Sequence, residues 1–202
     1  MITGELKSKV DQLWTTFWSG GIANPLSVIE QITYLLFAKR LDDLHTTREK
    51  KANLLGGEIE DPIFENGQDH LRWSRFKDFD PEKKFTVFKD EVFPFIKELN
   101  GRAGSSYTKF MKDAVFIVPN PALLDKVVNM IEDIPMQDRD TKGDLYEYML
   151  SKIASAGKNG QFRTPRHIIK MMVELVAPTP KDVICDPACG TCGFLVMAAE
   201  YL

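Results

Sequence analysis

Apolar side chains recur at steps of three and four residues over most of the first 156 positions, which predicts a mainly helical region. The first run is interrupted by Gly20-Gly21 and restarts at Asn24-Pro25. Asn24 can cap the second helix with its side-chain oxygen, and Pro25 suits the first helical position. We expect helices over residues 5–19, 25–51, 82–99, 121–131 and 144–156.

Two stretches of this region depart from the helical pattern. Residues 53–70 contain glycines, Pro62, Asn66 and several acids, and they predict an irregular connection with room for a hairpin. Pro94 lies inside the run at 82–99. It predicts a kink there, because proline lacks an N–H and its ring clashes with the preceding turn.

The pattern changes after about residue 156. Thr164-Pro165 predicts a helix start by the same cap-and-proline rule, and Pro178-Thr179-Pro180 ends that helix. Val183-Ile184-Cys185 is a short, mostly β-branched run bounded by turn signals, and it predicts a strand. A glycine loop and a helix from Phe194 follow, so this region reads as the opening of an α/β unit.

The 202-residue chain has ordinary globular composition, with 44% hydrophobic and 27% charged residues. It has no apolar run of about 18 residues and no basic segment before an apolar one, so we expect no membrane partner and no secretory leader. Its three cysteines cluster between positions 185 and 192, which fits a reducing cytoplasm better than a disulfide framework. The net charge of -3 argues against a protein that simply coats nucleic acid.

The candidate chemistry lies in the loop after the predicted strand. A strand that turns through glycines into a helix leaves backbone N–H groups exposed at the helix N-terminus. This loop has Gly190 and Gly193, with Asp186 at the strand end, instead of the three spaced glycines of a dinucleotide site. It suits a ligand with an amino-acid tail better than one with two phosphates. An ordinary strand-to-helix turn is the alternative.

Two segments together resemble the modification subunit of type I restriction–modification systems, a family of N6-adenine DNA methyltransferases. The first is Gly160-Gln161-Phe162-Arg163-Thr164-Pro165, and the second is Asp186-Pro187-Ala188-Cys189-Gly190-Thr191-Cys192-Gly193-Phe194. Residues 34–41 resemble the family's first long helix, and residues 140–148 resemble the helix that leads into its methyltransferase domain. The resemblance therefore spans nearly the whole chain.

The resemblance implies that the chain binds S-adenosyl-L-methionine through these two segments. Within them, Gln161 and Thr164 would offer hydrogen bonds to the methionine carboxylate or amino group, and Phe162 would pack against the cofactor. Cys192 stands where the family commonly has alanine or glycine, which narrows the loop slightly. The full implied set is Gln161, Phe162, Arg163, Thr164, Pro165, Arg166, Asp186, Gly190, Thr191, Cys192 and Gly193.

The resemblance also implies a fold and a function. The fold is mainly α, with a helical bundle-like domain over residues 1–145 and the first helix–strand–helix of a Rossmann-like methyltransferase domain over residues 146–202. The function is methyl transfer from S-adenosylmethionine to N6 of adenine in target DNA, in the cytoplasm. The implied partners are DNA, a specificity subunit, a restriction subunit and a second modification subunit.

The family's catalytic Asn-Pro-Pro-aromatic tetrapeptide, which grips a flipped adenine, does not occur in these 202 residues. We expect it, and the acid that meets the cofactor's ribose hydroxyls, beyond Leu202. We therefore expect these residues alone to be inactive and to bind the cofactor weakly or not at all.

Three alternatives stay open. The chain can be a helical protein- or DNA-interaction module with a non-functional methyltransferase stub. Cys185, Cys189 and Cys192 have the spacing at which radical S-adenosylmethionine proteins hold an iron–sulfur cluster, although small buried thiols are favoured and we expect no metal. Arg72 and Arg75, which flank Trp73, are candidate DNA contacts. The N-terminal aromatic residues at helical spacing are expected in the core instead; they are Trp14, Phe17, Trp18, Phe37, Phe85 and Phe88.

Overall fold

The computed structural model describes residues 4–99, 111–134, 164–189 and 192–202, together with Leu145, Tyr148, Met149 and Lys152. The chain divides into two compact units, Met1–Ala156 and Gly157–Leu202. The described residues form helices and loops with no strand among them, which confirms the expectation of a mainly α protein. The domain boundary predicted between residues 145 and 146 stays a prediction.

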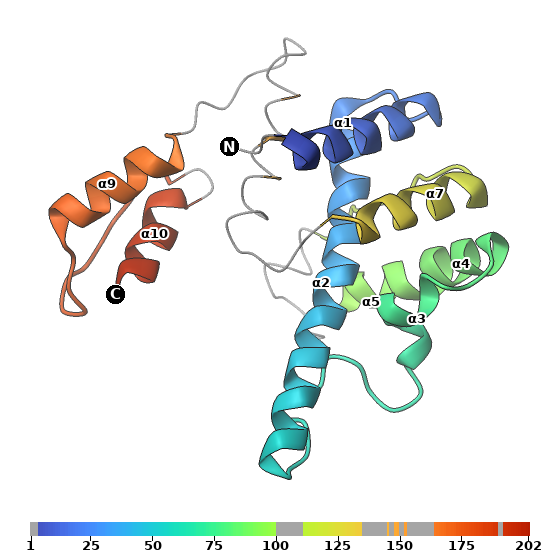
Figure 1. The fold of residues 1–202 in the computed structure, drawn as a ribbon, viewed down its shortest axis with the longest axis horizontal. Helices are drawn as coiled ribbons and strands as arrows, with labels where there is room; N and C mark the ends of the chain where they lie inside the picture. The colour runs from blue at the N-terminus through green and yellow to red at the C-terminus, as the bar shows by residue number, and fades with distance from the viewer. Residues whose placement is uncertain are drawn as a thin grey trace. The chain divides into compact units, whose positions relative to one another are not determined.

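The first two helices are α1 (Gly4–Ser19) and α2 (Pro25–Leu55), separated at the glycine pair as predicted. The side chain of Asn24 accepts a hydrogen bond from the backbone N–H of Leu26 at 3.0 Å, so the predicted cap is confirmed. Gly56 ends α2 in the left-handed conformation, with φ of 68°. The C-terminal part of α2 extends beyond the other helices of its unit (Figure 1).

The segment after α2 forms turns and bends, and its residues 56–68, all described, include no strand. The irregular connection is therefore confirmed, and the hairpin for which it left room does not form. The Nδ1 atom of His45, on α2, accepts hydrogen bonds from the backbone N–H groups of Ile63 and Phe64 at 3.2 and 3.4 Å. This loop therefore satisfies backbone donors with a side chain of α2 instead of a partner strand. The short helices η1 (Asp69–Leu71) and α3 (Trp73–Phe76) follow.

The expected kink at Pro94 takes the form of a wide turn. The segment runs through α4 (Pro81–Val87), a π-helical turn η2 (Phe88–Val92) and α5 (Phe93–Glu98). The backbone N–H of Phe93 donates to the carbonyl of Phe88, five residues back. In an unbroken α-helix the ring of Pro94 would clash with the carbonyl four residues earlier, and a π turn relieves that clash while the chain stays helical.

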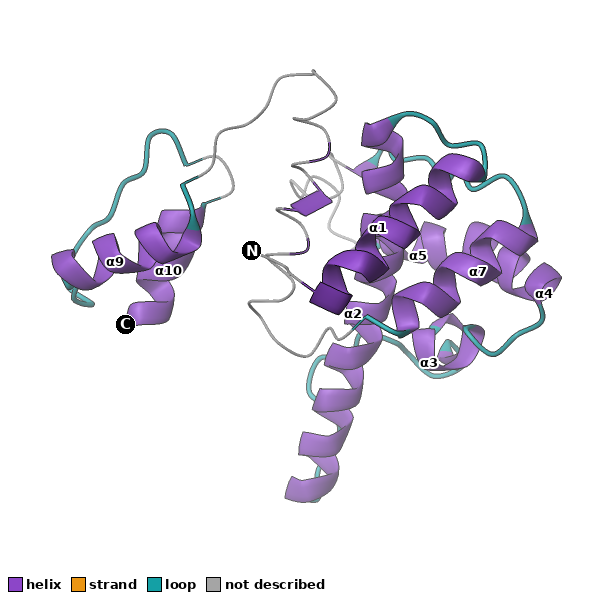
Figure 2. Ribbon diagram, turned by 45° about the horizontal axis from the view of Figure 1, so that its top comes forward, coloured by secondary structure: helices purple, strands orange, loops and turns teal. Residues whose placement is uncertain are grey.

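Helix α7 (Pro121–Glu132) begins as predicted, because the side chain of Asn120 accepts the backbone N–H of Leu123 at 2.9 Å. It packs against α1 and α4 (Figure 2). The buried ammonium of Lys84, on α4, pairs with the carboxylate of Asp125, on α7. Burying a charge is tolerated only when it is paired, so this contact fixes how the two helices meet.

The segment at residues 114–119, which is neither helix nor strand, is held against α2 by Gln31. The buried amide of Gln31 donates to the carbonyl of Val115 and accepts from the N–H of Ile117, each at 3.0 Å. This double hydrogen bond is the pairing that a neighbouring strand would otherwise supply. It places Phe116 against Phe88 and Phe93 in the core.

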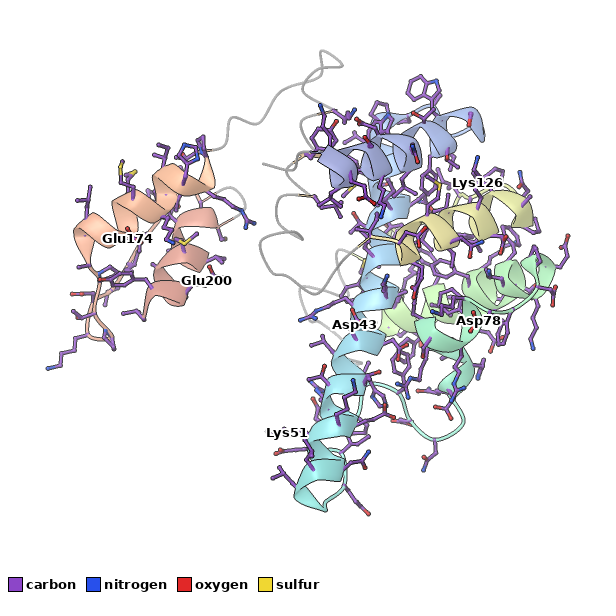
Figure 3. All side chains as sticks on the ribbon, in the orientation of Figure 1. Asp43, Lys51, Asp78, Lys126, Glu174 and Glu200 are labelled. Carbon is purple, nitrogen blue, oxygen red and sulfur yellow. The ribbon has the colours of Figure 1, made fainter. Side chains whose placement is uncertain are left out.

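The core of this unit contains most of the aromatic residues that were expected there. Phe17 and Phe88 are fully buried, and Trp14, Phe37 and Phe85 pack against the core. Trp18 is the exception, with 51% of its surface exposed. Charged side chains such as Lys51 and Lys126 project outward (Figure 3). No helix of the described residues is long and apolar enough to cross a membrane.

The second unit contains α9 (Arg166–Val176) and α10 (Gly193–Tyr201), which pack through Ile169, Val173 and Ala198. Residues 183–185 are not assigned as a strand, so the predicted strand is not formed, and Val183 is 96% exposed. A strand needs a hydrogen-bonded neighbour, and the described residues of this unit offer none. The Rossmann-like detail of the expected fold therefore stays a prediction.

Candidate cofactor-binding site

The structure describes six of the eleven residues that the sequence assigned to a cofactor site. These are Thr164, Pro165, Arg166, Asp186, Cys192 and Gly193. The other five lie outside the described residues. They are Gln161, Phe162, Arg163, Gly190 and Thr191. The six described residues belong to the starts of α9 and α10 and to the loop between these helices.

Helix α9 begins without a side-chain cap. Its N-cap residue is Pro165, whose carbonyl accepts the N–H groups of Ile168 and Ile169 at 2.9 and 3.1 Å. Thr164 is exposed and lies one residue too early, so the expectation that it caps this helix is wrong. The N-cap residue itself therefore offers no side-chain acceptor to the first N–H groups of α9.

The loop between the helices is shaped by its own acidic residues. The carboxylate of Asp182 accepts the backbone N–H and the hydroxyl of Thr179 at 2.7 and 2.8 Å, and these hydrogen bonds lower the pKa of Asp182. The carboxylate of Asp186 accepts the backbone N–H of Ala188 at 3.1 Å. This contact is an Asx turn, so Asp186 bends the chain immediately after residues 183–185.

Helix α10 also begins without a side-chain cap. Its N-cap residue is Cys192, which adopts the left-handed conformation with φ of 61° and ψ of 25°. Gly193 follows, and a Cβ atom at this position would lie 3.1 Å from Cδ1 of Ile169 on α9. A glycine here therefore lets the two helices approach closely at their first turns.

The N-termini of α9 and α10 lie at the same end of this unit, because Gly193 meets Ile169 one turn into α9 (Figure 1). The N-cap residues of α9 and α10, Pro165 and Cys192, make no side-chain cap bond, whereas Asn24, Asp80 and Asn120 cap α2, α4 and α7. The N–H groups of a helix N-terminus and the positive end of its dipole favour an anionic group. A carboxylate is one such group.

The same loop also contains the three cysteines of the chain. The thiols of Cys185 and Cys189 are exposed, and that of Cys192 is half-buried. A side-chain hydrogen bond with Cys192 raises the pKa of Cys189. The described residues contain no group of three or more histidine, cysteine or acidic residues arranged to hold a metal ion.

Two of the three residues in the candidate DNA contact, Arg72 and Trp73, make their contacts within the protein. The guanidinium of Arg72 makes two 2.9 Å hydrogen bonds to the carboxylate of Glu49 and one of 2.6 Å to Asp42, and its side chain is only 11% exposed. Trp73 is 3% exposed. Arg75 is exposed and stays available. Sequence inspection missed this network, since its members lie far apart along the chain.

Comparison with known proteins gives two adjacent family matches. The family described as HsdM N-terminal domain matches residues 6–131, and the family described as N-6 DNA Methylase matches residues 137–202. The second match contains both segments that carry the candidate site.

Two individual relatives are methylase subunits of type I restriction enzymes. The type I restriction enzyme EcoEI methylase subunit of Escherichia coli is 29% identical over 90% of this chain and 38% of that protein. The EcoKI methylase subunit of Escherichia coli strain K12 is 46% identical over 33% of this chain and 13% of that protein.

A solved structure covers almost all of the chain. It is a modification subunit of a putative type I restriction enzyme from Vibrio vulnificus YJ016, with a TM-score of 0.70 and 28% sequence identity over 98% of this chain. The chain spans 45% of that structure and 38% of the EcoEI subunit.

Proposed function

The chain belongs to the HsdM N-terminal domain family and corresponds to part of a type I modification subunit, and on this premise we propose that it serves methyl transfer from S-adenosylmethionine to N6 of adenine in DNA. One observation carries the proposal. The match to the N-6 DNA Methylase family covers Gln161 to Pro165 and Asp186 to Phe194 together. These two segments are the ones that would hold the cofactor.

The cofactor's amino-acid end is assigned to the paired starts of α9 and α10. The two N-termini lie at one end of the unit, and the methionine carboxylate is an anion of suitable size for the N–H groups of a helix start. Thr164, next to the start of α9, would add its hydroxyl, and Asp186 would hold the loop in shape by its bond to Ala188.

The remaining assigned residues lie outside the described ranges, and their roles rest on the family resemblance. Gln161 would bond the amino or carboxylate group, and Phe162 would pack against the cofactor. Arg163, Gly190 and Thr191 would complete the two segments. When bound, S-adenosylmethionine supplies the methyl group, while these residues bind and orient its amino-acid end.

DNA and a specificity subunit are the proposed partners of the whole modification subunit, with a restriction subunit and a second modification subunit. The helical unit would contact one or more of these partners and connect them to the methyltransferase unit. Its net contribution to DNA attraction is small, because the whole chain carries a charge of -3 and Arg72 is used internally. By family resemblance, sequence choice is assigned to the specificity subunit.

The cofactor site can be tested in a chimera. Residues 1–202 would replace the matching part of the EcoEI methylase subunit, and the product would be assembled with its specificity subunit. Thr164→Val removes one hydroxyl and should raise the KM for S-adenosylmethionine about tenfold with little change in kcat, because a binding contact is lost. Lys181→Ala, at an exposed position in the same unit, is the matched control and should change neither constant.

If the chain is only a helical interaction module, the chimera experiment should give a different result. In that case the assembled chimera would bind the specificity subunit and DNA but transfer no methyl group. An unchanged KM in Thr164→Val would instead leave methyl transfer in place and remove Thr164 from the cofactor site.

The role of the helical unit needs its own measurement. Deleting residues 1–140 from the chimera should abolish binding to the specificity subunit or to DNA, measured by size-exclusion chromatography and by fluorescence anisotropy. If both interactions survive the deletion, the helical unit does not bridge to either partner.

A further inference from the structure

Cys189 and Cys192 stand at the two ends of a hydrogen-bonded turn. The backbone N–H of Cys192 donates to the carbonyl of Cys189, three residues earlier, at 2.6 Å. A turn closed in this way holds its end Cα atoms within about 7 Å, and a disulfide spans Cα atoms separated by about 4.4 to 6.8 Å. The backbone therefore already has the reach that a disulfide between these two residues needs.

Contact with Cys192 also changes how readily Cys189 ionises. A side-chain hydrogen bond with Cys192, with a smaller contribution from the charge of Asp186, raises the pKa of Cys189, so Cys189 holds its proton more tightly than a free cysteine. Cys189 is exposed and Cys192 is half-buried, so reagents in solution reach the pair. The spacing Cys-x-x-Cys is the one used by dithiol–disulfide redox pairs.

We propose that Cys189 and Cys192 are a reversible redox pair that forms an intramolecular disulfide across the turn. The oxidant is a small disulfide such as glutathione disulfide. One protein thiolate attacks a sulfur of the oxidant, which forms a mixed disulfide and releases one glutathione thiolate. The second protein thiol loses its proton and attacks the mixed disulfide, which closes the Cys189–Cys192 bond and releases the second glutathione thiolate.

The location of the pair gives the disulfide a consequence, which rests on the proposed function. Cys192 is the N-cap of α10 and directly precedes Gly193, at the place assigned to the cofactor's amino-acid end. A disulfide would cross-link the ends of the turn and fix the two sulfur atoms in contact with each other at this place. The oxidised protein should therefore bind S-adenosylmethionine at least about tenfold more weakly than the reduced protein.

The disulfide itself is tested on the 202-residue chain by mass spectrometry. The chain is equilibrated in a glutathione redox buffer, free thiols are alkylated with N-ethylmaleimide, and the intact mass and peptides are measured. The oxidised chain should carry one label, on Cys185, with Cys189 joined to Cys192. Dithiothreitol should restore labelling of all three cysteines. Cys185→Ser should still form the bond, and Cys189→Ala should not.

Three results would overturn the proposal. They are three labelled cysteines at every buffer ratio, a disulfide that involves Cys185, and bonds between two chains instead of within one. None of these readings depends on cofactor binding, so failure of the redox pair is distinguishable from failure of the proposed function.

The consequence is tested in the chimera described above. Methyl transfer should fall at least about tenfold in the oxidising buffer and recover with dithiothreitol, whereas Cys189→Ala should keep its activity in both buffers. Full activity of a chimera whose disulfide is confirmed by mass would refute the effect on the cofactor. A chimera that is inactive when reduced would contradict the proposed function and leave the mass result to decide the redox pair.

Discussion

Trp73 and Glu132 join the segment after α2 to the end of α7: the indole Nε1–H of Trp73 donates to Oε2 of Glu132 at 2.6 Å. The same carboxylate accepts from Lys77 at 2.7 Å and pairs with Lys39 at 3.2 Å. Lys39 also donates to the last carbonyl groups of α7, at Ile131 and Glu132. Three donors therefore converge on one helix C-terminus.

Trp73→Phe removes the indole donor and keeps an aromatic ring. We expect it to lower the free energy of unfolding by about 1–2 kcal/mol, because one charge-assisted hydrogen bond and part of the buried ring are lost. Urea denaturation followed by circular dichroism measures the change. Trp18→Phe, at an exposed position of α1, is the control and should leave the midpoint unchanged. Equal midpoints for both variants would show that the Trp73–Glu132 bond adds nothing.

Glu132 should make stability depend on pH. Partial burial opposes ionisation, but hydrogen bonds from Lys77 and Trp73 and the charge of Lys39 lower the pKa of Glu132 from 4.5 to about 2. A carboxylate with a lowered pKa stabilises the fold above its unfolded-state pKa and loses that contribution as the pH falls through the folded-state value. Solvent screening of this part-exposed group limits the contribution to about 1 kcal/mol.

Glu132→Gln should therefore destabilise the protein at neutral pH, and the difference from wild type should shrink as the pH falls below 4.5. Denaturation midpoints measured from pH 7 to pH 3 check this, and the exposed position Glu58 supplies a control variant, Glu58→Gln. A difference that stays constant across this range would contradict the assignment.

Arg72→Lys tests the ion network between α2 and α3. Lysine keeps the charge but cannot reproduce the fork that bonds both oxygens of Glu49 while also meeting Asp42 and Thr46. We expect a loss of about 2–3 kcal/mol, because one ammonium group cannot reach Glu49 and buried Asp42 together, and one carboxylate is left without its paired charge. Arg75→Lys, at an exposed neighbouring position, should be neutral in the same thermal denaturation experiment. A neutral Arg72→Lys would mean that charge alone suffices.

Gly20→Ala tests the close approach of α1 and α7. A Cβ atom at this position would lie 2.5 Å from Cδ2 of Leu123 and 3.0 Å from the carbonyl of Thr16. The buried Leu123 would have to move, and we expect a cost of about 1–3 kcal/mol. Gly57→Ala has open space around the added methyl and should be neutral, so an equal change in Tm for both variants would contradict the steric account.

Gly193→Ala tests the packing of α9 against α10. The added methyl would lie 3.1 Å from Cδ1 of Ile169, so we expect the amides of both helices to lose protection in hydrogen exchange. Ile169→Val removes that Cδ1 atom, and the double variant should regain part of the protection. No gain in the double variant would mean that Gly193 is required for another reason.

Helix starts could be predicted from the sequence because capping is local chemistry. Asn24 and Asn120 cap backbone N–H groups two or three residues away, as their sequence positions indicated. Pro94 predicted a disturbance correctly, but its form, a π turn, depends on how the surrounding helix packs. The strand at 183–185 could not be settled locally, because a strand is defined by a hydrogen-bonded neighbour.

The residues of the candidate site stay a prediction, and the structure adds geometry at six of them. The family resemblance marked Gly193 as part of a cofactor loop, whereas the structure adds a second reason for a glycine, the contact with Ile169. Arg72 looked available for DNA because its partners, Asp42 and Glu49, lie 30 and 23 positions away. Contacts at such separations cannot be read from local sequence patterns.

The identity of the methylated base tests the central claim most directly. The chimera of residues 1–202 with the rest of the EcoEI methylase subunit would be incubated with its specificity subunit, DNA and S-adenosylmethionine, and the DNA digested to nucleosides for mass spectrometry. We predict N6-methyladenine, at a level that falls when Thr164 is replaced by valine and S-adenosylmethionine is limiting. A folded, assembled chimera that yields no N6-methyladenine would contradict the claim.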